Sequence, residues 1–158
     1  GGFIMREIIT NDNIFGLPKN TNDAVCVTTN GMVKNNGYAV MGAGIAKQAN
    51  QLFNCSYKLG SLLSKHGNHV FNLGLVRAYG ITYRLFTFPT KHDWRNNSDL
   101  KLITQSAHEL VHFCNCFNIQ TCYLPPVGCG LGNLDWETQV KPILSPILDD
   151  RFIVILRP

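Results

Sequence analysis

Two glycine-rich stretches, each lying after an apolar run and ahead of a helical segment, constrain this sequence more than any other feature. Residues 42–46 read GAGIA, and residues 128–132 read GCGLG. The apolar runs 24–29 and 119–125, which precede them, have the composition of buried strands. In open α/β sheets, ligands bind beyond the carboxyl ends of the strands. We therefore expect both stretches to line one crevice.

Strand-like and helix-like segments alternate along the chain. This alternation predicts an α/β fold in which a mixed central sheet carries helices on both faces. Ser98 is the predicted N-cap of the longest helix, residues 88–97 are predicted to be a loop, and a tight turn is expected at 80–81. The predicted strands cover 5–10, 24–29, 69–79, 82–88, 119–125 and 151–156, and the predicted helices cover about ten residues from 45, then 56–67, 98–117 and a short segment from 136 that restarts at 142.

Length and composition point to one folded domain. The chain has 158 residues, of which 45% are hydrophobic and 15% charged, a balance typical of a globule with a single core. We expect this domain to span 5–158 and to be a monomer, and we interpret residues 1–4, before Met5, as a cloning remnant. No apolar run approaches the roughly 18 residues of a membrane span, and no leader pattern opens the chain. The six cysteines form no CxxC pair, which favours a reducing, cytoplasmic setting.

The glycine-rich stretches point to an anion. Backbone N–H groups left uncovered by small residues, beside the positive end of a helix, bind negative charge. The first stretch is not a dinucleotide fingerprint, because Lys47 stands where the third glycine should be, and no Gly-Lys-Ser/Thr motif occurs in the chain. Either stretch alone is equally well explained as a turn with a helix cap. Two such stretches together favour a ligand with two adjoining phosphates.

Other residues admit a functional or a plain interpretation. The HELVH at 108–112 matches a zinc-protease pattern, but helical geometry turns both histidines away from the apolar face, and we predict no metal site. Cys129 fits loop packing better than a nucleophilic role, since a bound diphosphate would disfavour its thiolate. Lys91 follows a strand and is an ordinary solvated charge unless the crevice lies beside it. Trp94 is expected to cover the core, and Asp135 to cap a helix.

Taken together, three segments resemble the macrodomain, the ADP-ribose-binding fold. They are AVCVTTNGMVKNNGYAVMGAGIA at 24–46, FPTKHDWRN at 88–96 and LPPVGCGLGNLDW at 124–136. The branch they resemble contains the terminal ADP-ribose protein glycohydrolase and the DarG antitoxin macrodomain, and FPTK followed by Trp is especially close to the DarG form. The resemblance runs from about residue 8 to residue 148 and implies the three-layer macrodomain fold.

The resemblance also implies roles for individual residues. Asp12 corresponds to the acidic residue that accepts a hydrogen bond from the adenine amino group, and Asn30 to the asparagine that faces the distal ribose. Lys91 corresponds to the lysine that this branch uses in catalysis. The two sides of the diphosphate would be held by the glycine-rich stretches, at Gly42, Ala43, Gly44 and Ile45 and at Gly128, Cys129, Gly130, Leu131 and Gly132.

Three departures from the pattern matter. Val27 stands where the family often has an asparagine, and the segment 32–40 is longer than the usual link into the first glycine-rich stretch. Gly132 stands where the protein glycohydrolase has an aspartate, and DarG-type members also have glycine there. The resemblance therefore favours a DarG-like mechanism over one that uses both a lysine and an aspartate.

The activity implied is hydrolysis at C1″ of ADP-ribose, with no cofactor and no metal. The expected substrate is an ADP-ribosylated macromolecule, either a DNA base or a protein carboxylate, and the net charge of +4 leans only slightly toward nucleic acid. Two alternatives stay open at this point: an ADP-ribose reader without catalysis, and an ADP-ribose-1″-phosphate phosphatase that would use the longer 32–40 segment. A zinc protease is a distant third.

Overall fold

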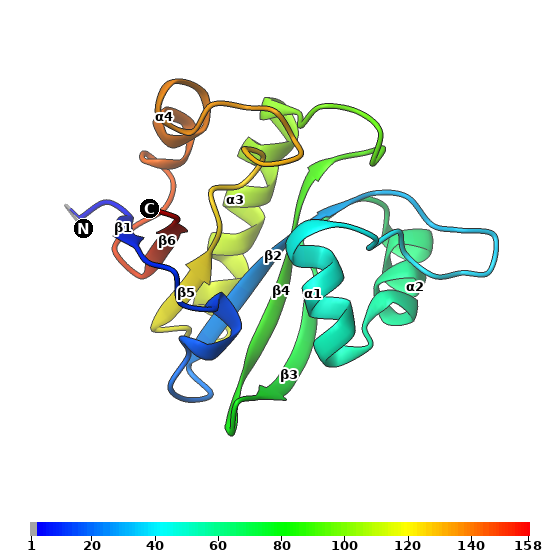
Figure 1. The fold of residues 1–158 in the computed structure, drawn as a ribbon, viewed down its shortest axis with the longest axis horizontal. Coiled ribbons are helices and arrows are strands. Elements are labelled where there is room, and N and C mark those ends of the chain that lie inside the picture. The colour runs from blue at the N-terminus through cyan, green and yellow to red at the C-terminus, as the bar shows by residue number, and fades with distance from the viewer. Residues whose placement is uncertain (1–2) are drawn as a thin grey trace.

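The computed structural model describes residues 3–158, and its centre is one mixed six-stranded sheet (Figure 1). The strand order is β1-β6-β5-β2-β4-β3; neighbouring strands are parallel except for the antiparallel pair β3 and β4. The strands are β1 (Arg6–Ile9), β2 (Asp23–Asn30), β3 (Asn72–Ala78), β4 (Ile81–Lys91), β5 (Thr121–Leu124) and β6 (Phe152–Leu156).

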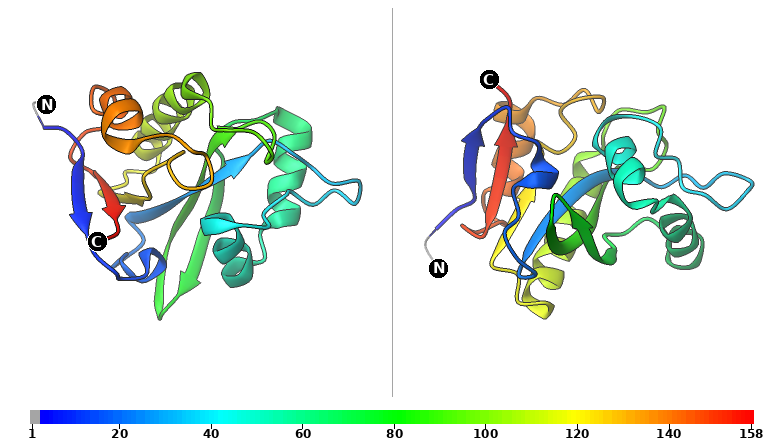
Figure 2. Two further views of the ribbon diagram at one scale, coloured as in Figure 1. Left: turned by 45° about the horizontal axis from the view of Figure 1, so that its top comes forward. Right: turned by 60° about the horizontal axis from the view of Figure 1, so that its bottom comes forward.

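Helices cover both faces of this sheet, as the alternation of segments predicts (Figures 1 and 2). One face carries α1 and α2 and the other carries α3 and α4. The helical elements are the 3-10 turn η1 (Ile14–Gly16), α1 (Gly44–Phe53), α2 (Ser56–His66), α3 (Leu100–Cys116), the π-helical turn η2 (Trp136–Val140) and α4 (Lys141–Leu144).

The core lies in two layers, one on each side of the sheet. Side chains of a strand point alternately to the two faces, and β2 shows this directly. Ala24 and Cys26 pack with α3 and α4, whereas Val25 and Val27 pack with η1, α1 and α2. Both faces of this central strand are buried, so its nearly continuous apolar run is explained by its position.

Three local predictions differ from the structure. The N-cap of α3 is Asp99 and not Ser98, because the Asp99 carboxylate accepts hydrogen bonds from the N–H groups of Lys101 and Leu102. Strand β4 runs on through Lys91, so the first part of the predicted loop 88–97 is strand. The turn between β3 and β4 is centred on Tyr79 and Gly80, which both have positive φ (53° and 80°).

Candidate functional site

A cleft of about 820 Å³ opens where the carboxyl ends of β2, β4 and β5 meet. Residues from four segments line it: 28–30 at the end of β2; 40–46, which leads into α1; 90–98, at and after the end of β4; and 125–133, which follows β5. Both glycine-rich stretches are among them, so the prediction of a shared crevice is confirmed. Of the residues predicted from the sequence, the lining includes Asn30, Gly42, Ala43, Gly44, Ile45, Lys91, Gly128, Gly130, Leu131 and Gly132.

The first glycine-rich stretch leaves the N-terminus of α1 open toward the cleft. Its N-cap is Ala43, whose side chain cannot accept a hydrogen bond, and the first helical bond runs from the N–H of Lys47 to the Ala43 carbonyl at 3.2 Å. The N–H groups of 44–46 thus have no acceptor within residues 3–158. Unpaired N–H groups and the positive end of the helix dipole together form an anion site.

The second glycine-rich stretch is folded back on itself so that three N–H groups are left over. The N–H of Cys129 bonds the Pro126 carbonyl, and those of Asn133 and Leu134 bond carbonyls at Gly130 and Gly128. No bond within residues 3–158 uses the N–H groups of 130–132. This stretch therefore offers a second set of donors in the same cleft.

Glycine is required at 128 and 132 by close packing. Gly128 has φ of +78°, and a Cβ built there would lie 2.9 Å from Ile103 Cδ1. A Cβ at Gly132 would overlap the Ser98 hydroxyl and the Gly128 carbonyl. An aspartate at 132 would meet the same obstruction, which gives a steric reason for the glycine in this chain.

The two stretches approach each other across the cleft. Leu131 is 67% exposed, and its Cδ1 lies 3.9 Å from the position that a Cβ on Gly44 would take. Both sets of free N–H groups belong to residues that line this one cleft, and a diphosphate, with its two adjoining anionic groups, suits such a pair of donor sets chemically.

Asn30 and Lys91 lie at the end of two neighbouring parallel strands. They are register partners of β2 and β4, after an irregularity between Thr29 and Asn30. The Lys91 ammonium donates to the carbonyls of Trp94 (3.3 Å) and Asn96 (3.2 Å). The Asn30 side chain donates to the Val40 carbonyl at 3.0 Å and accepts from the Met32 N–H at 2.9 Å.

The segment 92–97, which follows Lys91, is held in shape by its own contacts. Arg95 makes a two-pronged ion pair with Asp93, at 3.0 and 2.7 Å, and these hydrogen bonds lower the pKa of Asp93 to about 2. Trp94 is 53% exposed and lines the cleft, so the prediction that it covers the core is wrong. Nothing in the sequence separates a core tryptophan from a cleft tryptophan in a short loop.

Two hydrogen bonds connect this segment to the second glycine-rich stretch. The Ser98 N–H donates to the Gly132 carbonyl at 3.0 Å, and the Asn133 side-chain amide donates to Asn97 Oδ1 at 2.9 Å. The hydroxyl of Ser98 is buried in the cleft wall and has no hydrogen-bond partner within residues 3–158. The segment after Lys91 and the second glycine-rich stretch thus form one connected wall of the cleft.

Cys129 and Asp12 lie outside the residues that line the cleft. The Cys129 thiol contacts the Val127 carbonyl and the core, and burial, followed by the Asp135 carboxylate, raises its pKa to about 11. This supports loop packing and opposes a thiolate nucleophile. Asp12 is exposed after β1, where its carbonyl accepts a hydrogen bond from Arg157 at 2.6 Å.

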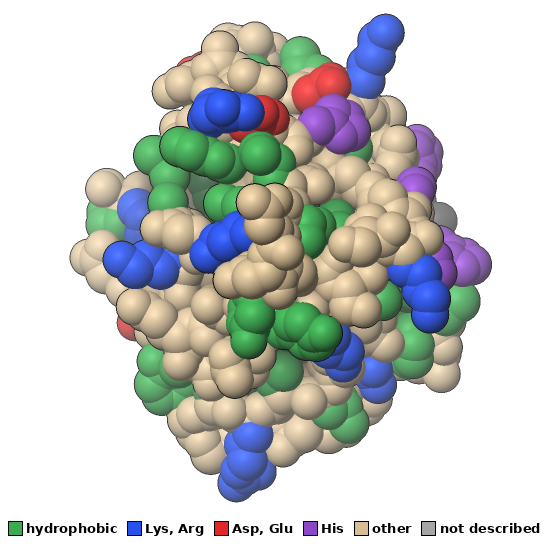
Figure 3. Space-filling view, turned by 90° about the vertical axis from the view of Figure 1, so that its right-hand side faces the viewer, with side chains coloured by type: hydrophobic (Ala, Val, Ile, Leu, Met, Phe, Trp, Pro, Cys, Tyr) green, Lys and Arg blue, Asp and Glu red, His purple; other side chains and the backbone are tan. Residues whose placement is uncertain are grey.

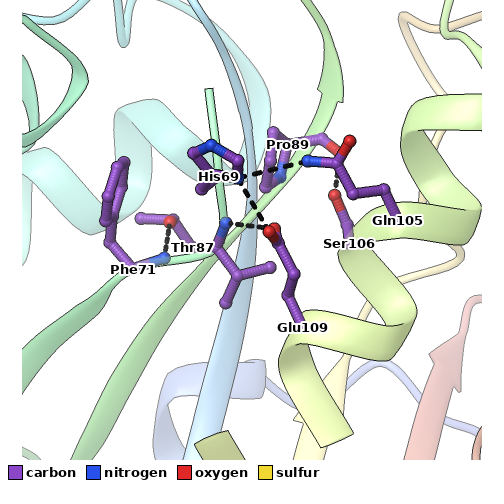
Figure 4. Close-up of polar contacts among 8 residues, drawn as sticks. His69, Phe71, Thr87, Pro89, Gln105, Ser106 and Glu109 are labelled. Atoms are coloured by element: carbon purple, nitrogen blue, oxygen red, sulfur yellow. Dashed lines mark hydrogen bonds and ion pairs between the residues drawn. The ribbon is translucent and has the colours of Figure 1, made fainter. Parts of the chain in front are cut away.

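The HELVH pattern has a structural explanation. His108 and His112 are exposed on α3, as the helical geometry predicts. Glu109, between them on α3, holds the segment before β3 in place. Its carboxylate pairs with His69 Nδ1 at 2.7 Å and accepts a hydrogen bond from the Val70 N–H at 3.0 Å (Figure 4). Within residues 3–158, no group of three or more His, Cys, Asp or Glu side chains is placed to hold a metal ion.

The chain has relatives of known name. It is 28% identical to the DNA ADP-ribosyl glycohydrolase of Thermus aquaticus over 119 residues, which are 72% of this chain and 32% of the relative. It is 30% identical to the enzyme of the same name from Mycobacterium tuberculosis over 113 residues, 70% of this chain and 32% of the relative. The match therefore spans about a third of each relative. No protein-family model matches the sequence.

Solved structures agree in fold. The macrodomain of Mycobacterium tuberculosis DarG superposes with a TM-score of 0.70 at 22% identity, over 96% of this chain and 98% of that one. Thermosipho africanus DarTG, solved in complex with ADP-ribose, gives 0.72 at 22% identity over 98% of this chain and 43% of that one. The fold of this chain is the macrodomain fold.

Within that class, the sequence relatives and the structural neighbours agree on one type. The chain is similar in fold to DarG macrodomains and in sequence to DNA ADP-ribosyl glycohydrolases.

Proposed function

We propose that this chain binds ADP-ribose in the cleft and hydrolyses the bond that joins C1″ of the distal ribose to a DNA base. The observation that carries the proposal is the convergence of two sets of unpaired N–H groups, at 44–46 and 130–132, on a cleft that also holds Lys91. The relatives named DNA ADP-ribosyl glycohydrolase support DNA as the acceptor, and the Thermosipho africanus complex supports ADP-ribose as the ligand.

In this proposal the diphosphate lies between the glycine-rich stretches. The N–H groups of 44–46 bind one phosphate and those of 130–132 bind the other. Asn30 faces the distal ribose. Its side-chain amide has one N–H hydrogen and one oxygen lone pair left for the sugar, because the others bond Val40 and Met32. Asp12, which lies outside the lining of the cleft, is the proposed partner of the adenine amino group.

Lys91 is the proposed catalytic residue. No carboxylate lines the cleft within residues 3–158, and its only cationic side chains there are those of Lys91 and Arg95. A guanidinium does not give up its proton at neutral pH, whereas an amine can act as nucleophile or transfer a proton. As the bond at C1″ breaks, the base leaves with the electron pair and the sugar gains oxocarbenium character. The Lys91 amine acts on that sugar, and water supplies the hydroxyl of the product.

The test is a release assay with three substrates: DNA-linked, ester-linked and phosphate-capped ADP-ribose. We expect the wild type to release ADP-ribose from the DNA-linked substrate and the Lys91→Ala variant to bind ADP-ribose without releasing it. Release from the phosphate-capped substrate alone would make the chain a phosphatase. Binding without release from any substrate would make it a reader.

The proposed setting is a reducing cytoplasm, supported by six cysteines that are all free thiols. Among residues 3–158, no helix has both the length and the apolar character that crossing a bilayer requires. We further propose a single domain over 5–158 that acts as a monomer.

A further inference from the structure

One part of the chain carries basic residues without any acidic ones. Between Ala24 and His92 the sequence contains no Asp or Glu at all, although it contains seven of the 14 Lys and Arg residues. This stretch forms β2, α1, α2, β3 and β4, which occupy the centre and the right of Figure 1. The side of the molecule seen in Figure 3 accordingly shows many Lys, Arg and His side chains and few acidic ones.

The segment Gly31–Val40 projects from this side as a hairpin (Figure 1). It is closed by the bridge between Val33 and Ala39 and by a hydrogen bond from the Lys34 N–H to the Tyr38 carbonyl at 2.8 Å. Its base is tied to the cleft, because the Asn30 side chain bonds Met32 and Val40 at both ends of the hairpin.

The hairpin is also packed firmly on α2. The Ala39 N–H donates to the Ser56 carbonyl at 2.8 Å. Gly60 lets the backbone pack directly on the helix, since a Cβ there would overlap the Gly37 carbonyl. The hairpin and α2 thus form one preformed surface beside the cleft.

Two exposed aromatic side chains stand on this surface. Tyr38 of the hairpin is 40% exposed and Tyr57 of α2 is 60% exposed, and their ring centroids are 5.2 Å apart with the planes tilted by 60°. Lys34 and Lys65, on the same two elements, are exposed and make no ion pair within residues 3–158. Aromatic rings for stacking and unpaired cations for phosphates are the two components of a single-strand nucleic-acid surface.

We propose that the hairpin 31–40 and α2 bind the single-stranded DNA that flanks the ADP-ribosylated base. This inference rests on the proposed function. A base inside a duplex cannot bring its modified edge into the cleft, so a single strand is the expected form. A neighbouring base stacks on the Tyr38–Tyr57 pair, and the strand's phosphates face Lys34 and Lys65. In this proposal the longer 32–40 segment contacts the DNA that carries the ADP-ribose and does not contact the ADP-ribose itself.

The test measures the affinity of the full chain for two ligands, a short unmodified single-stranded oligonucleotide and free ADP-ribose. Loss of both rings in Tyr38→Ala/Tyr57→Ala should weaken oligonucleotide binding about tenfold, within the range for loss of base stacking. The affinity for ADP-ribose should not change. Tyr57→Phe, which keeps the ring, is the matched control and should bind DNA as the wild type does.

Salt dependence tests the cations separately. Lys34→Gln should lower the slope of log affinity against log salt by about 0.7, the value for one phosphate contact to a single strand. Lys19→Gln makes the same charge change at an exposed position before β2, at the end of that strand opposite to the hairpin, and should leave the slope unchanged. Equal slopes for both variants would contradict the inference.

Failure of the inference is distinguishable from failure of the proposed function. Suppose that the wild type releases ADP-ribose from DNA and that the double tyrosine variant binds DNA as tightly as the wild type. This result overturns the DNA-binding role of the hairpin and α2 but leaves the proposed function intact. Wild type that binds the oligonucleotide but releases nothing overturns the function. A polyglutamate peptide that competes as well as DNA of equal charge overturns the assignment of the surface to nucleic acid.

Discussion

Asn30 and Lys91 are register partners at the carboxyl ends of β2 and β4, so the sheet itself sets their spacing. The Gly31 N–H continues this pairing by donating to the His92 carbonyl at 3.1 Å. Residues that belong to distant parts of the sequence are thereby held as precisely as two neighbours on one strand. The sheet therefore fixes the backbone position of Lys91, the proposed catalytic residue.

Lys91→Ala should retain ADP-ribose affinity and reduce release from DNA-linked substrate by about 10²- to 10⁴-fold, the range for a lost proton-transfer group. Titration calorimetry gives the affinity and single-turnover release gives the rate. Lys47→Ala, an exposed lysine on α1 outside the cleft lining, is the control. Unchanged release by the Lys91 variant would remove this residue from the mechanism.

Gly132→Ala should lower the free energy of unfolding by about 1–3 kcal/mol, as overpacking does. Its Cβ would collide with the Ser98 hydroxyl and the Gly128 carbonyl. Gly130→Ala is the matched control in the same stretch, since a Cβ there meets nothing within 4 Å. Denaturant unfolding measures both, and equal stability of the two variants would contradict the packing that we describe.

Asp99→Ala should destabilise the protein by about 1 kcal/mol, the usual effect of losing an N-cap. Ser98→Ala should leave stability unchanged or raise it, because its buried hydroxyl has no partner to lose. Thermal unfolding of the two variants side by side decides which residue caps α3. The reverse order of effects would restore the cap to Ser98.

Cys129→Ala should keep release from DNA-linked substrate within a small factor of wild type. Its thiol has a pKa of about 11, so it is protonated at neutral pH, and it packs against the Val127 carbonyl. Alkylation of Cys129 should accordingly speed up as the pH rises toward about 11. If the variant folds well but no longer releases ADP-ribose, the Cys129 thiol takes part in the reaction.

The Asp93–Arg95 pair should make the cleft wall sensitive to acid. Because the folded-state pKa of Asp93 is lowered to about 2, the pair's contribution to stability is complete above the unfolded pKa of about 4. It is lost as the pH falls from there toward about 2. The stability difference between wild type and Asp93→Asn should be constant near neutrality and shrink below pH of about 4. A difference independent of pH would mean that the pair contributes nothing.

Much of the fold could be predicted from the sequence because local patterns and tertiary packing agree. The apolar run at 24–29 is a strand buried on both faces, and α1 and α3 follow from apolar residues at helical spacing. The cap of α3 could not be predicted, since Ser98 and Asp99 are both good N-cap residues. What decides between them is the packing of Ser98 against Gly132, which is remote in sequence.

The site was predictable where backbone chemistry fixes it and unpredictable where loops do. The glycine-rich stretches can be recognised from their composition, whereas the catalytic role proposed for Lys91 comes from the family resemblance. The positions of Trp94 and Asn97 depend on how the 92–97 segment meets the second glycine-rich stretch. The absence of acidic residues from 24–92 is visible in the sequence, but only the topology shows that these residues share one side.

The paired links from Ser98 to Gly132 and from Asn97 to Asn133 also bear on how such a scaffold can diversify. Lengthening either of these two loops alone would break the hydrogen bonds that join them. The wall of the cleft in which we propose that ADP-ribose binds would then be disrupted. Insertions at the tip of the hairpin between β2 and α1 should avoid that penalty, because the hairpin meets the 92–97 segment at its base, where the Gly31 N–H donates to the His92 carbonyl. New acceptor preferences should therefore evolve by remodelling that one projection while the cleft, the proposed site of hydrolysis, is retained.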